Sequence, residues 1–175
     1  MNENPRIEIM DTTLRDGEQT SGVSFVPHEK LMIARLLLEE LRVDRIEVAS
    51  ARVSEGEFNA VRMICDWAAR KNLLSRVEVL GFVDGKTSVD WIYNTGCRVI
   101  NLLTKGSEKH CTFQLKKTLQ EHLADIRQTV AYAIDKGMDV NVYLEDWSNG
   151  IKDSPDYVFG LVDGLKDTGI RRFML

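Results

Sequence analysis

The chain has 175 residues, of which 43% are hydrophobic and 29% are charged, and its formal net charge is −4. This composition is typical of a globular protein with a core and argues against long disordered stretches. No apolar run approaches the ~20 residues of a membrane-spanning helix, and the polar start does not resemble a secretory signal. The acidic balance gives no reason to expect nucleic-acid binding. We therefore expect a cytoplasmic protein without membrane or nucleic-acid partners.

Six short runs rich in Ile, Val and Leu recur along the chain, with helical patterns between them. We predict strands over residues 7–10, 45–49, 77–81, 99–103, 140–144 and 172–175. Such apolar runs are typical of parallel strands that are covered on both faces. Few polar residues interrupt them, and Glu47, Glu78 and Asn101 are among the exceptions.

Apolar residues at three- and four-residue spacing predict the helices. The first helix begins near Pro27, and its apolar face consists of Leu31, Ala34, Leu38 and Leu41. Serine or threonine followed by glutamate three positions later predicts capping boxes at 54–57 and 118–121, ahead of two further helices. A short helix is expected around 89–94, and another opens at Ser154 with Pro155. Three glycines before strands are expected to end helices, namely Gly96, Gly137 and Gly169.

Successive strand centres lie about 33 residues apart, which is the size of a βα unit. Two α/β architectures have this order: an open doubly wound sheet and a (β/α)8 TIM barrel of about 250 residues. The length favours the open sheet, whereas a chain that stops within a strand favours an incomplete barrel. We see no linker or change of composition, so residues 1–175 are interpreted as part of one barrel domain.

The cysteines and histidines show none of the spacings typical of metal sites. We expect Cys65 and Cys97 to be small buried side chains and Cys111 to lie in a polar loop. Surface or capping roles are expected for the three histidines, which are His28, His110 and His122.

Polar residues follow the predicted strands, at the end where parallel α/β folds bind their ligands. They include Asp11, Arg15, Asp16, Gln19, Ser50, Arg52, Asp84, Thr104, Lys105, Glu145, Asp146 and Asn149. Charged loop residues are often only solvated, so the pattern by itself is a weak indication of a site.

The segment 11–19, which reads Asp-Thr-Thr-Leu-Arg-Asp-Gly-Glu-Gln, is much more specific. It resembles the opening signature of a family of metal-dependent (β/α)8 enzymes that make or break a carbon–carbon bond beside a carbonyl. This family includes 2-isopropylmalate, homocitrate and citramalate synthases and the hydroxymethylglutaryl-CoA lyases. The resemblance is strengthened by further segments at 44–54, 80–85, 101–107 and 142–150. Together the segments look most like the (R)-citramalate synthase branch. The resemblance covers residues from about 7 to 175.

The resemblance implies an acyltransferase of amino-acid biosynthesis that condenses acetyl-CoA with a 2-ketoacid, most simply pyruvate to citramalate. It implies a divalent metal (Zn, Mn or Mg) held by Asp16, with Arg15 at the keto oxygen, where a fixed guanidinium would stabilise the developing alkoxide. Gln19 is expected to bind substrate. Glu145 is expected to help remove a proton from acetyl-CoA or to position the base that does so.

The resemblance also places Leu80, Leu103 and Tyr143 around the side chain of the ketoacid. Bulky apolar groups there would leave room for the methyl of pyruvate and crowd a longer side chain. The alternative for Leu80 and Leu103 is an ordinary barrel core, and Val83 and Asn101 are weaker candidates for this pocket.

The His-x-His metal pair of the family belongs to a later strand, so this chain has one metal carboxylate where three protein ligands are needed. We expect five units and the start of a sixth from a longer barrel, inactive or nearly so by itself. Unpaired edge strands also predict self-association into a homo-oligomer. The alternatives are isopropylmalate or homocitrate synthase, a lyase of the family, or a non-catalytic open α/β binding module.

Overall fold

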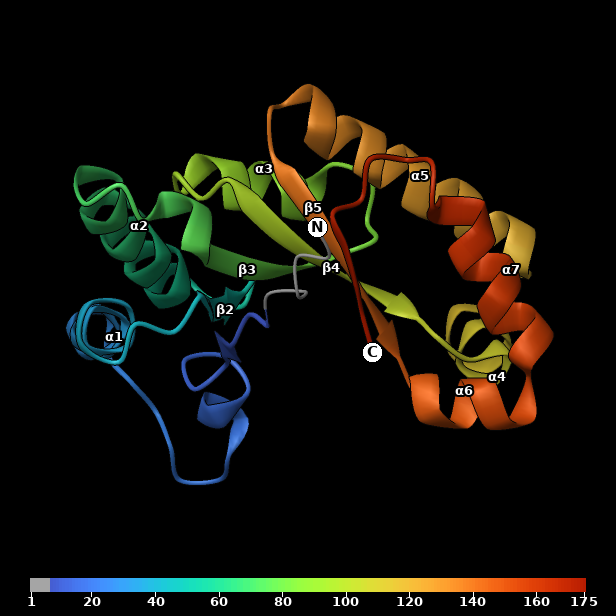
Figure 1. The fold of residues 1–175 in the computed structure, drawn as a ribbon, viewed down its shortest axis with the longest axis horizontal. Helices are drawn as coiled ribbons and strands as arrows, with labels where there is room; N and C mark the ends of the chain where they lie inside the picture. The colour runs from blue at the N-terminus through green and yellow to red at the C-terminus, as the bar shows by residue number, and fades with distance from the viewer. Residues whose placement is uncertain (1–6) are drawn as a thin grey trace, which may run out of the picture.

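The structure is a computed structural model that describes residues 7–175, and its centre is a curved sheet of six parallel strands (Figure 1). Each strand pairs with the next one in the chain. The strands are β1 (Met10–Asp11), β2 (Arg45–Ser50), β3 (Val77–Phe82), β4 (Val99–Lys105), β5 (Asp139–Glu145) and β6 (Arg172–Met174). Consecutive order without reversal is that of a (β/α)8 barrel, whereas a doubly wound sheet reverses its strand order. The prediction of an incomplete barrel is therefore confirmed, and the open doubly wound sheet is wrong.

Helices cover the convex side of this sheet (Figure 1). The predicted ones are α1 (Pro27–Arg35), α2 (Glu55–Arg70), α3 (Thr87–Asn94), α5 (Leu119–Asp135) and α7 (Pro155–Leu165). Shorter elements that the sequence did not indicate are η1 (Gly17–Gln19), η3 (Leu74–Arg76), α4 (Glu108–His110), η4 (Cys111–Leu115) and α6 (Trp147–Asp153). The element η2 (Leu36–Glu40) follows α1 directly, over residues that the first predicted helix included. The predicted glycine ends are confirmed, because Gly96, Gly137 and Gly169 all have positive φ.

Two details of the N-terminal prediction are wrong. The first strand covers only Met10–Asp11 rather than 7–10: the carbonyl of Ile9 accepts from the Arg45 N–H, but the Ile9 N–H donates to the side chain of Asp44 rather than to a strand. The apolar face of the first helix does not extend to Leu41, which is 70% exposed. There the helix widens into the π turn η2, so the residues after it no longer keep the three- and four-residue spacing.

The two predicted capping boxes differ in outcome. Around Thr118 the reciprocal pair forms in full, since Thr118 accepts from the Glu121 N–H and Glu121 accepts from the Thr118 N–H. At Ser54 the side chain accepts from the Glu57 N–H, at 3.1 Å. The Glu57 carboxylate instead contacts Lys30, which is fully buried.

The strands place a mainly apolar face toward the helices and a more polar face on the concave side, where Leu80 and Leu103 are apolar exceptions. The side chains facing the helices form the core and include Ile46, Val48, Val79, Ile100, Leu102, Val140 and Val142, all fully buried. The alternate positions carry polar groups on the concave side, among them Arg45, Glu47, Glu78, Asn101, Asn141 and Arg172. The concave face of this half-barrel is therefore much more polar than its helix-covered face.

Ion pairs connect the two edges of the sheet across the concave side. Arg172 on β6 contacts Glu8, just before β1, with 2.6 Å between Nη2 and Oε2. Glu8 also lies 3.4 Å from Nε of Arg45, whose Nη1 contacts the buried Glu78. The edge strands β1 and β6 are the shortest of the six strands, and self-association through them stays a prediction.

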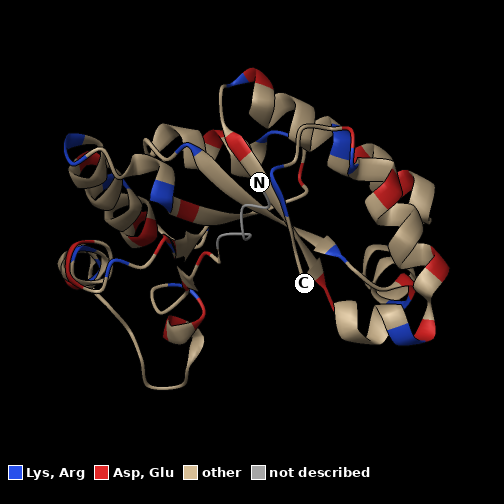
Figure 2. Ribbon diagram, viewed as in Figure 1, with Lys and Arg blue, Asp and Glu red and all other residues tan. Residues whose placement is uncertain are grey.

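Several buried groups complete the description. All three cysteines are free and buried, so Cys111 is not in an exposed polar loop as expected; its thiol faces the carbonyls of Lys117 and Thr118. The expectation for His122 is also wrong, since this residue is buried. Charged residues are spread over the helices (Figure 2), and within 7–175 no helix is long and apolar enough to cross a membrane.

Candidate active site

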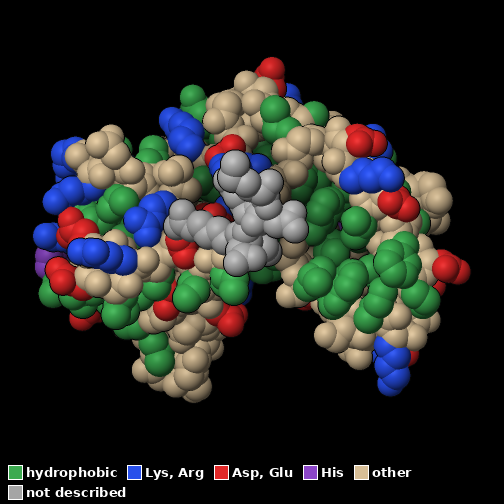
Figure 3. All heavy atoms as spheres, viewed as in Figure 1, with side chains coloured by type: hydrophobic (Ala, Val, Ile, Leu, Met, Phe, Trp, Pro, Cys, Tyr) green, Lys and Arg blue, Asp and Glu red, His purple; other side chains and the backbone are tan. Residues whose placement is uncertain are grey.

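The carboxyl ends of the strands face a notch between the loop after β1 and helix α6 (Figures 1 and 3). Two cavities of about 410 Å³ each lie at this end of the sheet. One is lined by residues from the loop after β1 and the end of β2, the other by the ends of β4 and β5. Arg15 lines both cavities, so the two spaces meet at its side chain.

The motif 11–19 folds into a compact turn directly after β1. The carbonyl of Thr12 accepts from the backbone N–H groups of Arg15, Asp16 and Gly17, at 2.8 to 3.2 Å. Asp11 accepts from the N–H and the hydroxyl of Thr13, which fixes the start of the turn. This local hydrogen bonding directs Arg15 inward while Asp16 stays 63% exposed.

The Arg15 guanidinium is held by two carboxylates. Its Nε donates to Oε2 of Glu47 at 2.6 Å, and its Nη1 donates to Oδ1 of Asp16 at 2.9 Å. Burial by itself would lower the pKa of Arg15, but the negative charge of Glu47 and its hydrogen bond raise this pKa above the ordinary value. Arg15 therefore remains a cation, and its guanidinium lies 5.8 Å from the centre of the Tyr143 ring.

Glu47 is fully buried on β2, and both of its oxygens are used. Oε2 accepts from Arg15, and Oε1 accepts from the Asn101 side chain at 2.7 Å. Burial raises the pKa of Glu47, while the hydrogen bond from Asn101 and the charge of Arg15 act against this rise. In the sequence Glu47 stands out only as a polar residue within a predicted strand, and no role was predicted for it.

The cavity at β4 and β5 brings together most of the predicted ketoacid and base residues. Leu103, Tyr143 and Glu145 all line it together with Arg15. Burial and the nearby Glu47 raise the pKa of Tyr143 to about 12, so this residue is a neutral phenol. Glu145 forms an ion pair with Lys105 at the end of the neighbouring strand.

Leu80 is the predicted pocket residue that lines neither cavity. It is almost fully buried, and its register partner on the next strand is Asn101, one row below Leu103. Its side chain therefore lies under the cavity of Leu103 and Tyr143 rather than in its wall, which matches the barrel-core alternative.

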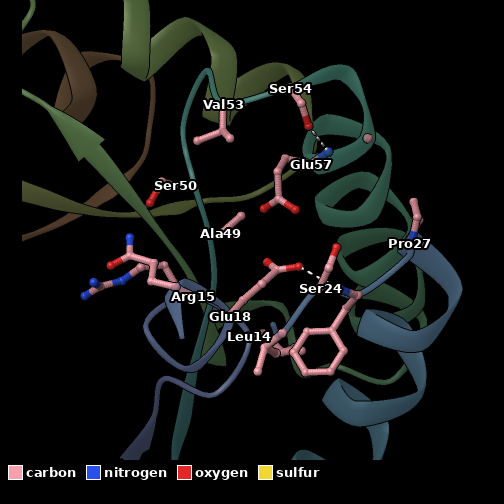
Figure 4. Close-up of a pocket in the computed structure, with 14 residues that line it drawn as sticks. Leu14, Arg15, Glu18, Ser24, Pro27, Ala49, Ser50, Val53, Ser54 and Glu57 are labelled. Atoms are coloured by element: carbon pink, nitrogen blue, oxygen red, sulfur yellow. Dashed lines mark hydrogen bonds between the residues drawn. The ribbon is translucent and has the colours of Figure 1, made fainter. Parts of the chain in front are cut away.

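The cavity at the loop after β1 contains Gln19 together with Glu18, Ser50 and Glu57 (Figure 4). In this view the carboxylates of Glu18 and Glu57 point toward one another. Lys30 joins them, with its Nζ 2.5 Å from Glu18 and 2.6 Å from Glu57. Lys30 also donates to the carbonyl of Leu14, the residue before Arg15, at 3.1 Å. Sequence reasoning missed Lys30 because it looked like an ordinary charged residue of an amphipathic helix.

The described residues do not provide a full set of metal ligands. Asp16 offers one carboxylate close to Arg15, but within 7–175 no three His, Cys, Asp or Glu side chains gather around one point. A divalent cation needs more protein ligands than this single carboxylate provides.

Comparison with known proteins places this chain in a family. A family model described as HMGL-like matches residues 6–175. The chain therefore belongs to the HMGL-like family, and the resemblance seen in the motif 11–19 is confirmed.

Relatives from three organisms carry three different synthase names. The chain is 38% identical to 2-isopropylmalate synthase of Saccharolobus solfataricus, over 95% of this chain and 41% of that protein. It is 36% identical to (R)-citramalate synthase of Methanocaldococcus jannaschii, over 80% of this chain and 27% of that protein. It is 42% identical to homocitrate synthase of Methanopyrus kandleri, over 79% of this chain and 33% of that protein. The chain thus spans less than half the length of these relatives.

The solved structures agree with the fold. The hydroxymethylglutaryl-CoA lyase of Bacillus subtilis superimposes with a TM-score of 0.68 at 19% identity, over 99% of this chain and 58% of that one. At this identity the likeness concerns the fold alone.

Proposed function

We propose that residues 1–175 form the N-terminal part of a synthase that condenses acetyl-CoA with a 2-ketoacid, and that the preferred ketoacid is pyruvate, giving citramalate. The observation that carries this proposal is the position of Arg15, on the wall shared by two cavities. A condensing enzyme must bring two substrates to one reacting centre. A cation between two adjoining spaces suits this requirement.

The ketoacid is assigned to the cavity at β4 and β5. Arg15 would face the keto oxygen and stabilise the alkoxide that forms when the carbon–carbon bond is made. Leu103 and the Tyr143 ring would contact the side chain of the ketoacid, with Leu80 supporting them from below. Bulky groups at these positions favour a methyl over a branched chain, which supports pyruvate as the substrate.

Acetyl-CoA is assigned to the cavity at the loop after β1, where Gln19 and Ser50 would hydrogen-bond to it. One proton must leave its methyl group before the bond to the keto carbon forms. Glu145 is assigned to accept this proton or to position the group that does. Its ion pair with Lys105 fixes the Glu145 side chain at the wall of the neighbouring cavity, which supports this assignment.

A divalent cation would polarise the keto oxygen of the bound ketoacid. Asp16 is the residue that we assign to it, since its exposed carboxylate lies next to the Arg15 guanidinium. One carboxylate does not make a site, so the remaining ligands would come from outside residues 7–175, and we derive no step through the metal.

The test is a CoA-release assay on a full-length protein that carries these residues, with acetyl-CoA and one ketoacid at a time. Pyruvate should give the highest kcat/KM, ahead of 2-oxoisovalerate and 2-oxoglutarate. A preference for 2-oxoisovalerate would instead assign the chain to isopropylmalate synthesis, and a preference for 2-oxoglutarate to homocitrate synthesis. No release with any of the three would overturn the proposal. The isolated chain should show little or no turnover.

A further inference from the structure

A row of three buried polar side chains crosses the concave side of the sheet. Glu47 on β2, Asn101 on β4 and Asn141 on β5 are all fully buried. Asn101 donates to Oε1 of Glu47 at 2.7 Å, and Asn141 donates to Oδ1 of Asn101 at 2.9 Å. Asn101 and Asn141 are also register partners in the sheet. Residues 54 and 40 positions apart thereby form one hydrogen-bonded row.

The carboxylate at one end fixes the direction of every hydrogen bond in the row. An ionised Glu47 can only accept, so Asn101 must turn its NH₂ group toward it. The Asn101 oxygen then faces Asn141, which must also present its NH₂ group. The Asn141 oxygen is consequently left buried and, among the residues that the structure describes, without a hydrogen-bond partner.

This arrangement is unfavourable for stability. A buried acceptor without a partner loses its hydrogen bonds to water and gains nothing in return. Leucine is close to asparagine in size and would fill the Asn141 position at no greater cost, since the unpaired oxygen of Asn141 would be lost and Oδ1 of Asn101 would lose its donor instead. A polar row that reduces stability is expected where it serves the site rather than the fold.

We infer that Asn101 and Asn141 are positioning residues for Arg15. Together they hold Oε1 of Glu47, so that Oε2 stays on Nε of Arg15. With Nε occupied, the guanidinium can turn only its terminal nitrogens toward Asp16 and toward a ligand in the two cavities. The importance of this placement for catalysis rests on the proposed function, whereas the placement itself rests only on the hydrogen bonds among Arg15, Glu47, Asn101 and Asn141.

The experiment compares the chain with its Asn141→Leu variant by ¹H–¹⁵N NMR of the Arg15 Nε–H group. The Arg15→Lys variant identifies this signal by its disappearance. In the parent chain we expect a signal protected from solvent exchange by the hydrogen bond to Glu47. In Asn141→Leu we expect a shifted signal that exchanges about tenfold faster, although the melting temperature changes little, because one unpaired buried oxygen replaces another.

The matched control is Thr129→Val, which removes a fully buried hydroxyl from α5, away from the row. This variant should lower the melting temperature slightly and leave the Arg15 signal unchanged. If both variants alter the signal alike, the effect is a general response of the core and the inference is overturned. An unchanged Arg15 signal in Asn141→Leu overturns it as well.

A second substitution guards against a folding failure. Asn141→Val places a β-branched side chain on the strand, where such residues pack well. If neither Asn141→Leu nor Asn141→Val folds, the row is needed for the fold and the inference is overturned. In full-length protein, Asn141→Leu should raise the KM for the ketoacid about tenfold. If that protein proves to have no condensing activity, the NMR result still decides whether Arg15 is positioned by this row.

Discussion

Nε of Arg15 lies 2.6 Å from Oε2 of Glu47, and this contact joins the loop after β1 to the middle of β2. The contact explains how a residue on a loop can be as fixed as one on a strand. Glu47 is buried within the sheet, so the guanidinium that it holds cannot follow movements of the loop.

Replacing Glu47 with glutamine should separate the effect of the Glu47 charge on activity from the effect of its side-chain shape. The Glu47→Gln variant keeps the size of the side chain but loses the counter-charge that holds Arg15. We expect kcat/KM of the full-length protein to fall by about 100-fold, since small displacements of a reacting group have effects of this size. The melting temperature should change little, because the variant also removes a buried carboxylate. Steady-state kinetics and thermal unfolding measure the two effects, and full activity in Glu47→Gln would contradict the role of this contact.

Substrate selectivity should depend on Leu103. Shortening this side chain in Leu103→Ala enlarges the cavity in which we place the ketoacid methyl. The ratio of kcat/KM values for pyruvate and 2-oxoisovalerate should shift toward the larger acid by about 10-fold or more, as expected for one or more methylene groups. Phe113→Ala, at an exposed position outside both cavities, is the control and should leave the ratio unchanged. An unchanged ratio in Leu103→Ala would remove Leu103 from the pocket.

Metal binding should depend on Asp16. Calorimetric titration of the full-length protein with Mn²⁺ should show affinity weakened by about tenfold or more in Asp16→Asn, since an amide is a poorer ligand than a carboxylate. Asp163→Asn, which changes an exposed carboxylate on α7, serves as the control. Equal affinities in the parent and Asp16→Asn would exclude Asp16 as a ligand.

His122 should make the stability of the chain depend on pH. Its Nε2 accepts a hydrogen bond from the Lys105 N–H at 3.1 Å, which requires the neutral ring. Burial lowers the pKa of His122 from 6.5 to about 4. The unfolded chain therefore binds the proton more readily between these values, and stability should fall as the pH drops from 6.5 toward 4. The full effect is about 3 kcal/mol at 1.36 kcal/mol per pKa unit.

Urea unfolding at pH 7 and pH 5 measures this dependence. The His122→Gln variant, whose side chain does not titrate, should lose most of the difference between the two pH values. If the parent and His122→Gln have the same pH dependence, other groups are responsible.

Removing Lys30 should destabilise the fold strongly. The Lys30→Met variant leaves Glu18 and Glu57 facing each other without the cation between them, and breaking a buried ion pair typically costs about 3–5 kcal/mol. A second change in the same chain, Glu57→Gln, should recover part of this loss. Urea unfolding of the single and double variants gives the coupling free energy between Lys30 and Glu57. Purely additive changes in the free energy of unfolding would show that these two residues do not interact.

The sequence predicted the six strands and the family motif well because their signals are local. Apolar runs mark strands that are buried on both faces, and the motif 11–19 is contiguous. The row of Glu47, Asn101 and Asn141 was not predicted as a unit, since register between strands is a property of the whole sheet. A usable signal existed: Asn141, Tyr143 and Glu145 alternate along one strand, as do Asn101, Leu103 and Lys105 on its neighbour.

Lys30 and Leu41 show where local patterns fail. Lys30 is the largest fully buried side chain of the described residues, yet its burial depends on carboxylates from two other segments. Leu41 continues the helical spacing in the sequence, but the π turn before it rotates it into solvent. At Lys30 contacts with distant segments override the local sequence pattern, and at Leu41 a non-ideal helix backbone does so.

The ion pair between Glu8 and Arg172 joins residues 164 positions apart, where no strand ladder among residues 7–175 connects the two edges of the sheet. Attraction between charges, rather than backbone pairing, thus helps to hold the two rims of the arc at their observed separation. Such attraction is screened over ~10 Å at 0.1 M salt and over ~3 Å at 1 M. High ionic strength should therefore weaken this contact between the β1 and β6 sides of the sheet more than it weakens the buried pair of Arg15 and Glu47.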